Sequence, residues 1–218
     1  MTIRKRPPHA APPRETYRHG DLRRALLDAG IALAREGGPT AVVLREATRQ
    51  AGVAPNAAYR HFANHQALFD AVRAHALGAL AQAIEREWRK ALRVREPAAQ
   101  ARALLRAVGT GYLGFAQAET GLFRTAFVFG QHEVQVPPDP ARTAAMGLNP
   151  FELLGAALDA MVATGVLPAE RRPQAEYLAW SAVHGMALLI IDGPLRAAPA
   201  AARRALAERL LVMVENGL

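Results

Sequence analysis

The twelve residues AGVAPNAAYRHF, from Ala51 to Phe62, constrain the fold more than any other part of the chain. Gly52 suits a tight turn because glycine accepts a positive φ without steric cost, and Pro55 suits the first position of a helix. The local pattern predicts one short helix over about Leu44 to Ala51 and another over about Pro55 to Phe62. Two short helices joined by a tight turn are typical of a helix-turn-helix unit, whose second helix can lie in the major groove of DNA.

The side chains of this unit divide into an apolar set and a polar set. Val53, Ala58 and Phe62 lie four or five residues apart, so they can face a small core that Leu44 and Ala47 complete. An asparagine amide can pair with adenine and a guanidinium with guanine, whereas Tyr and His side chains can hydrogen-bond phosphates or base edges. The alternative is an ordinary helical turn in which Tyr59 and Phe62 both belong to the core. The residues left on the exposed side are Pro55, Asn56, Ala57, Tyr59, Arg60 and His61.

Helical patterns continue along the rest of the chain, and no alternating pattern of convincing length predicts a strand. The predicted fold is therefore all-α, with an N-terminal three-helix unit joined by the fourth helix to a larger helical bundle. A proline-rich loop is expected around Val136 to Pro140. The further helices are expected from about Gly20 to Gly37, from His65 to before Pro97, over AAQARALLRAVGTGYLGFAQA, GLFRTAFVF and PFELLGAALDAMVATG, and at about Pro173–Asp192 and Pro199–Asn216.

Composition limits where such a chain can act. The longest apolar run, Met186 to Ile191, is far shorter than the roughly 18 residues of a membrane-spanning helix. Residues 1–16 are basic and rich in proline, so we expect a disordered tail, and no apolar segment behind them predicts a signal peptide. The absence of cysteine excludes disulfides, thiolate zinc sites and a cysteine nucleophile. A soluble cytoplasmic protein with no membrane partner is the simplest expectation.

The positive charge is concentrated near the N-terminus. The formal net charge is +8, and residues 1–75 carry twelve basic and six acidic side chains, so six of the eight net charges lie in the first third. Nearly all of the basic residues are arginines, whose forked guanidinium groups suit phosphates. This distribution predicts one electropositive module and one nearly neutral module.

The segment from Thr40 to Val72, TAVVLREATRQAGVAPNAAYRHFANHQALFDAV, resembles the DNA-binding region of the tetracycline-repressor (TetR) family. Its AGV, YRHF and HQALF elements occur in that family's order and spacing. The resemblance covers about residues 17–75, with the helix-turn-helix at about 44–62, and implies that residues 76–218 form an effector-binding and dimerisation domain.

The resemblance implies a homodimeric, sequence-specific transcriptional regulator, usually a repressor that a small molecule releases from DNA. Its two recognition helices are expected about 34 Å apart on a pseudo-palindromic operator of double-stranded DNA. No cofactor is implied. The DNA contacts that the resemblance implies in this sequence are Thr40, Arg45, Pro55, Asn56, Ala57, Tyr59, Arg60, His61 and His65.

Three positions depart from the family pattern. Val43 and Ala54 stand before the second and third helices, where the family usually has Ser or Thr. Losing a hydroxyl cap costs about 1 kcal/mol at each helix and removes a possible phosphate donor. His65 stands where the family usually has a lysine, so its phosphate contact would depend on protonation.

Two motifs suggest other functions but lack the context that those functions need. Gly109 to Gly114, GTGYLG, matches the dinucleotide-binding fingerprint, yet the preceding segment is helical and no strand–helix alternation surrounds it. We expect instead a helix with a close neighbour, loosened by its three glycines. His61 and His65 have metal-ligand spacing, but a break at about Ala63 and Asn64 separates them, so we expect no metal site.

The C-terminal third contains the segment WSAVHG, Trp180 to Gly185, which resembles a motif of one TetR-like subgroup. The surrounding helix is apolar on nearly every face, which is typical of a helix buried on both sides. With the last helix it predicts a four-helix dimer interface. The residues assigned to that interface are Trp180, Met186, Ile190, Leu206, Leu210 and Met213.

The aromatic midsection predicts a pocket for an apolar or aromatic effector, lined by Trp88, Tyr112, Phe115 and Phe127. His184 is either a satisfied core histidine or a further pocket residue. Two other functions stay open: a dimeric helical adaptor that does not bind DNA, and a helical enzyme. Neither is favoured, because no convergent catalytic groups are evident and an adaptor has no need for exposed Tyr59, Arg60 and His61.

Overall fold

A computed structural model describes residues 19–128 and 139–218. Over those residues it is all-α with no strand, which confirms the predicted fold class. The predicted tail, residues 1–16, and most of the predicted proline-rich loop lie outside the described residues. The elements are α1 (His19–Gly37), η1 (Pro39–Ala41), α2 (Leu44–Gln50), α3 (Pro55–Ala58), α4 (His65–Ala91), α5 (Pro97–Ala118), α6 (Thr120–Ala126), η2 (Pro140–Arg142), α7 (Pro150–Ala163), η3 (Ala169–Arg171), α8 (Ala175–Ile191), η4 (Pro194–Ala197) and α9 (Ala200–Gly217).

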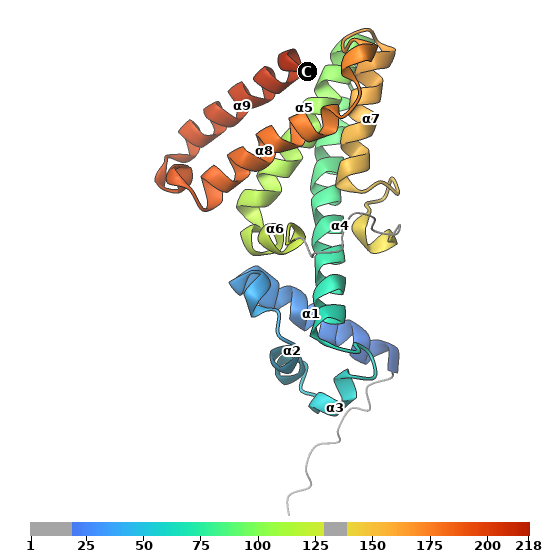
Figure 1. Cartoon of the computed structure of the whole chain (residues 1–218), viewed down its shortest axis with the longest axis vertical. Helices are drawn as coiled ribbons and strands as arrows, with labels where there is room; N and C mark the ends of the chain where they lie inside the picture. The colour runs from blue at the N-terminus through green and yellow to red at the C-terminus, as the bar shows by residue number, and fades with distance from the viewer. Residues whose placement is uncertain (1–18, 129–138) are drawn as a thin grey trace, which may run out of the picture.

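The helices form two regions that one long helix connects (Figure 1). Helices α1, α2 and α3 lie at one end with the first turns of α4, and we call this region the head. Helix α4, 27 residues long, continues from the head into a bundle with α5, α7, α8 and α9. Helices α8 and α9 pack side by side at the far end of the molecule (Figure 1).

The head is built as its sequence predicts. Gly52 has a φ of 67°, which explains why glycine suits the turn between α2 and α3. Leu44, Ala47, Ala58 and Phe62 are buried in the core, while Val53 is half-buried. Helix α3 is shorter than expected because regular structure ends at Ala58, although the Phe62 amide still donates to the Ala58 carbonyl.

Helix α4 begins where the predicted break ends. The Asn64 side chain caps it by accepting a hydrogen bond of 2.9 Å from the Ala67 amide. Leu68 and Val72 then pack against Gly30 of α1, where a Cβ would lie 2.8 Å from a methyl group of Val72. The start of α4 is therefore fixed to the head.

The glycines of the GTGYLG segment lie within α5, which continues through them without a break. A Cβ at Gly111 would lie 2.6 Å from the Cα of Ile84, so the glycine allows α5 and α4 to touch along their backbones. A Cβ at Gly109 would collide with Leu211 of α9. The expected close neighbour is confirmed, whereas the expected loosening of this segment is wrong because tertiary packing compensates for the low helix propensity of glycine.

Helix α6 gives the bundle a second contact with the head. A Cβ at Gly121 would collide with the carbonyl oxygens of Ala34 and Arg35, so α6 lies directly against the end of α1. Nε of Arg35 also donates to Glu119 at 3.1 Å. Movement of α6 relative to the bundle would therefore reach the head without passing through α4.

Among the described residues, no helix is both long enough and apolar enough to cross a membrane.

Candidate ligand cavity and DNA interface

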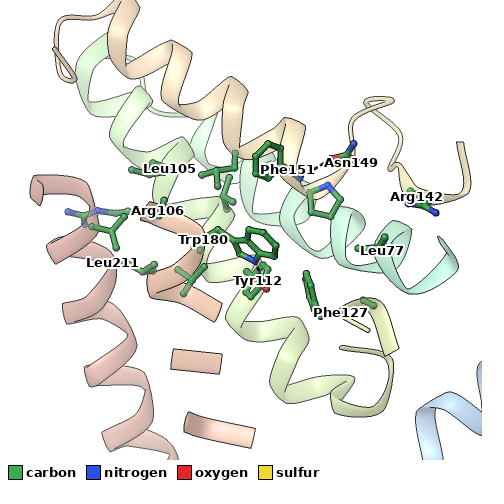
Figure 2. Close-up of a pocket in the computed structure, with 18 of the residues that line it drawn as sticks. Leu77, Leu105, Arg106, Tyr112, Phe127, Arg142, Asn149, Phe151, Trp180 and Leu211 are labelled. Atoms are coloured by element: carbon green, nitrogen blue, oxygen red, sulfur yellow. Dashed lines mark hydrogen bonds between the residues drawn. The ribbon is translucent and has the colours of Figure 1, made fainter. Parts of the chain in front are cut away.

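The bundle encloses a cavity of about 220 Å³ between α4, α5, α7 and α8 (Figure 2). Its walls are mainly apolar and aromatic, and Tyr112, Phe127, Phe151 and Trp180 all contribute to them. Small-molecule sites are typically concave, mostly apolar and equipped with a few polar groups. This cavity has that character.

A short hydrogen-bonded chain runs along one wall. Nε1 of Trp180 donates to the Tyr112 hydroxyl at 3.0 Å, and that hydroxyl lies 2.7 Å from Nδ1 of His184. An indole nitrogen can only donate, so the Tyr112 hydroxyl accepts from Trp180 and its own proton is available to Nδ1 of His184. In that arrangement the His184 ring is neutral, with its own proton on Nε2.

Burial favours the same protonation states. It raises the pKa of Tyr112 and lowers the pKa of His184, so both side chains stay uncharged at neutral pH. His184 also packs on Phe127 and Phe123, with ring centroids 5.0 and 5.7 Å away. His184 therefore sits behind Tyr112 as a partnered histidine rather than among the cavity-lining residues.

The predicted pocket residues fall into two groups. Tyr112 and Phe127 line the cavity. Trp88 and Phe115 do not line it, and both side chains are buried elsewhere in the core. Their assignment to the pocket is corrected: both are aromatic, but they lie on faces of α4 and α5 that pack against other helices.

Three arginines reach the cavity, and none of the described residues that line it is acidic. Arg106 lies at the end nearest α9 and is paired with Glu215, which also accepts a hydrogen bond from Arg102 at 3.1 Å. Arg142 lies at the other end, near Leu77 and Asn149 in Figure 2. Arg73 precedes Leu77 by one turn of α4.

The head presents a polar surface at the opposite end of the molecule. Tyr59 is 58% exposed, Arg60, Pro55 and Asn56 are exposed, and His61 and Ala57 are half-buried. Ala58 and Phe62 fill the core instead, so Tyr59 does not belong to it. The alternative of an ordinary turn with Tyr59 in the core is wrong.

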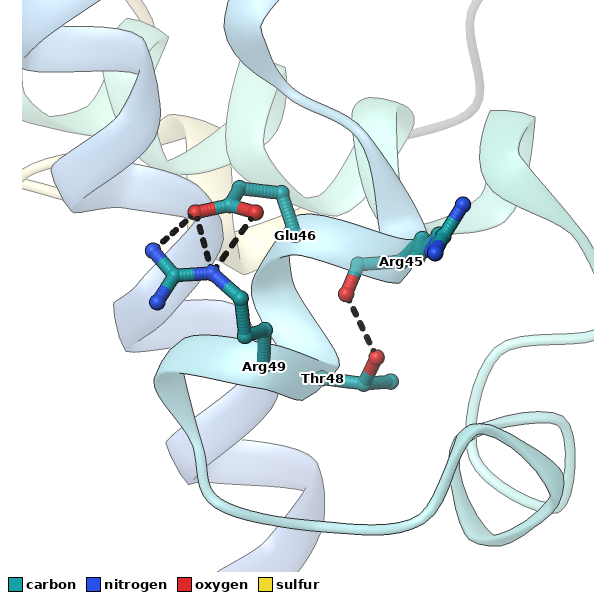
Figure 3. Close-up of polar contacts among 4 residues, drawn as sticks. All are labelled: Arg45, Glu46, Thr48 and Arg49. Carbon is teal, nitrogen blue, oxygen red and sulfur yellow. Dashed lines mark hydrogen bonds and ion pairs between the residues drawn. The ribbon is translucent and has the colours of Figure 1, made fainter.

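Helix α2 separates two arginines (Figure 3). Arg49 forms an ion pair with Glu46 across one turn, with Nε 2.9 Å from the carboxylate oxygens. Arg45 extends to another side of the helix, is exposed, and forms no ion pair with a described residue. Thr48 is buried and donates to the Arg45 carbonyl at 2.6 Å, which fixes the backbone at this point.

The departures from the family pattern have structural consequences. Val43 and Ala54 occupy the cap positions of α2 and α3, and neither provides a side-chain hydrogen bond. Nε2 of His65 lies 2.5 Å from the Val42 carbonyl oxygen, so it must donate there. His65 therefore ties the start of α4 to the start of α2, which leaves only Nδ1 for any further contact.

Comparison with known proteins agrees with this architecture. A family described as "Bacterial regulatory proteins, tetR family" matches residues 26–72, and one described as "Tetracyclin repressor-like, C-terminal domain" matches residues 105–214. The chain belongs to the TetR family. It is a DNA-binding transcriptional regulator, and membership of this family indicates a regulator rather than an enzyme.

Solved structures share the fold. A protein of unknown function from Rhodococcus sp. RHA1 aligns with a TM-score of 0.70 and 25% identity, over 94% of this chain and 99% of that chain. AmtR of Mycobacterium smegmatis aligns with a TM-score of 0.50 and 19% identity, over 94% of this chain and 90% of that chain. No curated protein matches the sequence.

The dimer residues expected for a TetR-family chain need revision. Met186 and Ile190 are 8% and 3% exposed within one protomer, so their own bundle already covers them. Trp180 lines the cavity, and Leu206 and Leu210 are half-buried. Among the six predicted residues, Met213 is the exposed one, at 60%. A helix that is apolar on every face does not reveal which side meets its own bundle.

Sequence reasoning also missed residues that line the cavity, including Arg73, Arg142, Phe151 and Leu154. A signal existed for Arg73, because it interrupts the apolar spacing of α4 between Phe69 and Leu77. A signal also existed for the start of α7, where Asn149 and Glu152 form a capping box around Pro150. That box places Phe151 at the cavity mouth.

Proposed function

We propose that this TetR-family protein is a homodimer that represses transcription by binding a pseudo-palindromic operator, and that a small molecule in the bundle cavity releases it. The observation that carries the DNA-binding part is the exposure of Tyr59 and Arg60 beside the buried Ala58 and Phe62. A large aromatic side chain exposed directly after a four-residue helix gains nothing from the core. It gains contacts when that surface meets DNA.

The exposed residues of the head would make different kinds of contact with DNA. Arg60 and Asn56 are the side chains suited to base edges, whereas Tyr59, His61, Thr40 and Arg45 would meet the sugar–phosphate backbone. Pro55 and Ala57 would let the backbone approach the groove closely. His65 would add a phosphate contact through Nδ1 when its ring is protonated.

The dimer would form through the exposed apolar side chains of α8 and α9. These are Tyr177, Leu178, Leu188, Leu189, Val212 and Met213. Contiguous apolar patches on a soluble protein mark interaction surfaces. Helices α8 and α9 from each protomer would then make the four-helix interface that the sequence predicts, using faces that their own bundle does not cover.

The effector would act through the two elements that join the cavity to the head. Helix α4 lines the cavity and its first turns belong to the head, and α6 lies against α1. A ligand that changes their relative position would change the spacing of the two recognition helices. Its effect is limited to its differential affinity for the two states, typically about 1–3 kcal/mol. As a bacterial regulator of transcription, the protein would act in the cytoplasm.

Gel retardation and DNase protection with the DNA upstream of its own gene test this proposal. The protein is expected to protect a pseudo-palindromic site and to bind it at least about 1,000-fold more tightly than a scrambled duplex at the same salt concentration. Equal affinity for both duplexes would contradict the DNA-binding part. If the operator is bound but no compound that fills the cavity weakens it, the effector part is wrong.

A further inference from the structure

The arginines of the head, between residues 19 and 65, divide into those with a carboxylate partner and those without one. The paired residues are Arg24 with Asp28 at 3.7 Å, Arg35 with Glu119 at 3.1 Å, and Arg49 with Glu46. The others, Arg23, Arg45 and Arg60, form no ion pair with a described residue, and all three are exposed. An exposed cation without a carboxylate partner is available to a polyanion.

Arg45 and Arg60 already belong to the surface assigned to DNA, whereas Arg23 lies on α1, outside the helix-turn-helix. Its guanidinium carbon is 5.1 Å from the centroid of the Phe62 ring. Because the ring face attracts a cation, this contact holds the charged end of Arg23 in one place. Phe62 itself is only 2% exposed, so the ring belongs to the core while the guanidinium group stays at the surface.

The contact with Phe62 places Arg23 beside the recognition surface. Phe62 follows the exposed residues Tyr59 and Arg60 closely in sequence, and its amide donates to the Ala58 carbonyl at 2.9 Å. Helix α1 also contacts α3 directly, and both lie at the same end of the molecule (Figure 1). Two separate helices therefore bring exposed arginines to one region of the head.

The width of the major groove indicates what a group in this position would meet. The groove is about 12 Å wide, so a helix that enters it has a phosphate backbone on each side. Groups at the flanks of that helix meet phosphates, whereas groups that project from it can reach base edges. Arg23 comes from a neighbouring helix and is held on Phe62, so it belongs to the flank.

We propose that Arg23 is a further DNA-binding residue, which contacts a phosphate beside the recognition helix while Phe62 holds its guanidinium group in position. This inference rests on the proposed operator binding and adds a contact to it. The DNA interface then extends from the helix-turn-helix to α1 and includes all three arginines that lack a carboxylate partner in the described head.

The alternative is that Arg23 only covers Phe62. Two substitutions separate the charge from the cover. Arg23→Met keeps a long, unbranched side chain that can lie on the ring but removes the charge, whereas Arg23→Lys keeps the charge. Arg24→Met is the matched control, because Arg24 is the adjacent residue of α1 and already pairs with Asp28.

Affinity for the operator and for a scrambled duplex is measured at four or more salt concentrations. Arg23→Met is expected to weaken binding about tenfold at the lowest salt concentration and to lower the slope against salt by about 1. Both duplexes should be affected alike, since a phosphate carries no sequence information. Arg23→Lys should keep the slope of the parent protein, and Arg24→Met should change it less than Arg23→Met does. The thermal unfolding midpoint should be the same in all four proteins.

The inference is overturned if Arg23→Met leaves the slope unchanged, or if Arg24→Met lowers it as much. It is also overturned if Arg23→Met and Arg23→Lys weaken binding equally, because Arg23 would then act through its packing on Phe62 and not through its charge. In each of these cases the parent protein still prefers its operator, and the proposed function stands. If the parent protein shows no such preference, the proposed function fails, and the slopes on the scrambled duplex still decide whether Arg23 contacts a phosphate.

Discussion

The head and the cavity use arginine in opposite ways. In the head, Arg45 and Arg60 are exposed on α2 and just after α3, where solvent screens them and a polyanion can approach them directly. In the cavity, Arg73 and Arg142 are largely enclosed by the bundle, where a charge is costly to bury and is screened little. The same side chain is therefore available to a polyanion in one region and belongs to the packed interior in the other.

This contrast indicates what each region can tolerate. Substitutions in the head should change DNA affinity and leave stability nearly intact, since its exposed side chains support little of the fold. Substitutions in the cavity should change both ligand binding and stability, since its polar groups are partnered inside the core.

The largest expected effect comes from separating the two protomers. Leu178→Asp combined with Met213→Asp places four charges in the proposed dimer face, whose two parent side chains are 63% and 60% exposed in one protomer. Operator affinity should fall by about 100- to 10,000-fold, because one head then binds without the other. Analytical ultracentrifugation should show monomers, and circular dichroism should show unchanged helicity. A dimer that persists would place the interface elsewhere.

Removing the exposed side chains of the head comes next. Tyr59→Ala and Arg60→Ala should each weaken operator binding by about 10- to 100-fold, a loss of roughly 1–3 kcal/mol. Thermal unfolding should remain unchanged, because neither side chain belongs to the core. A large fall in the unfolding midpoint with little change in affinity would reverse the assignment of this surface.

A substitution in the cavity wall, unlike one on the surface of the head, should lower the stability of the protein. Tyr112→Phe leaves Nε1 of Trp180 and Nδ1 of His184 without the hydroxyl that they share. We expect a loss of about 1–2 kcal/mol in stability, which lowers the unfolding midpoint by roughly 2–4 °C per kcal/mol. Calorimetry measures this shift. His184→Asn is a useful comparison, because its amide oxygen can still accept the Tyr112 proton.

The smallest effect distinguishes two arginines on the same helix. Arg45→Ala should lower the slope of operator affinity against salt concentration by about 1, as expected for one lost phosphate contact. Arg49→Ala should change that slope less, because Glu46 already pairs with Arg49. Affinities measured at four or more salt concentrations give both slopes. Equal changes in the two variants would mean that the ion pair opens on DNA.

The two regions also differ in how far the sequence predicts them. Gly52 and Pro55 act on the chain next to them, so the helix-turn-helix can be predicted without any distant contact. Arg73 meets the carbonyl of Ala126, 53 residues away, and nothing local indicates that partner. Gly121 likewise needs its contact with α1 before its role can be recognised.

The dependence on distant contacts also explains why some pocket and dimer residues of the bundle were wrongly assigned. Trp88, Phe115, Met186 and Ile190 are correctly predicted to lie on apolar helices, but periodicity does not specify which neighbour covers each face. Only the packed bundle separates a cavity wall from the core and from a face that is left exposed.

The distance between the two heads tests the central claim most directly. The chain has no cysteine, so Ala63→Cys, an exposed position just after α3, gives one spin label in each protomer for pulsed electron–electron distance measurement. On the operator we predict one narrow distance, set by recognition helices about 34 Å apart in successive major grooves, and a different distance when a small molecule in the cavity releases the DNA. A distance that neither the operator nor such a molecule changes would contradict the account.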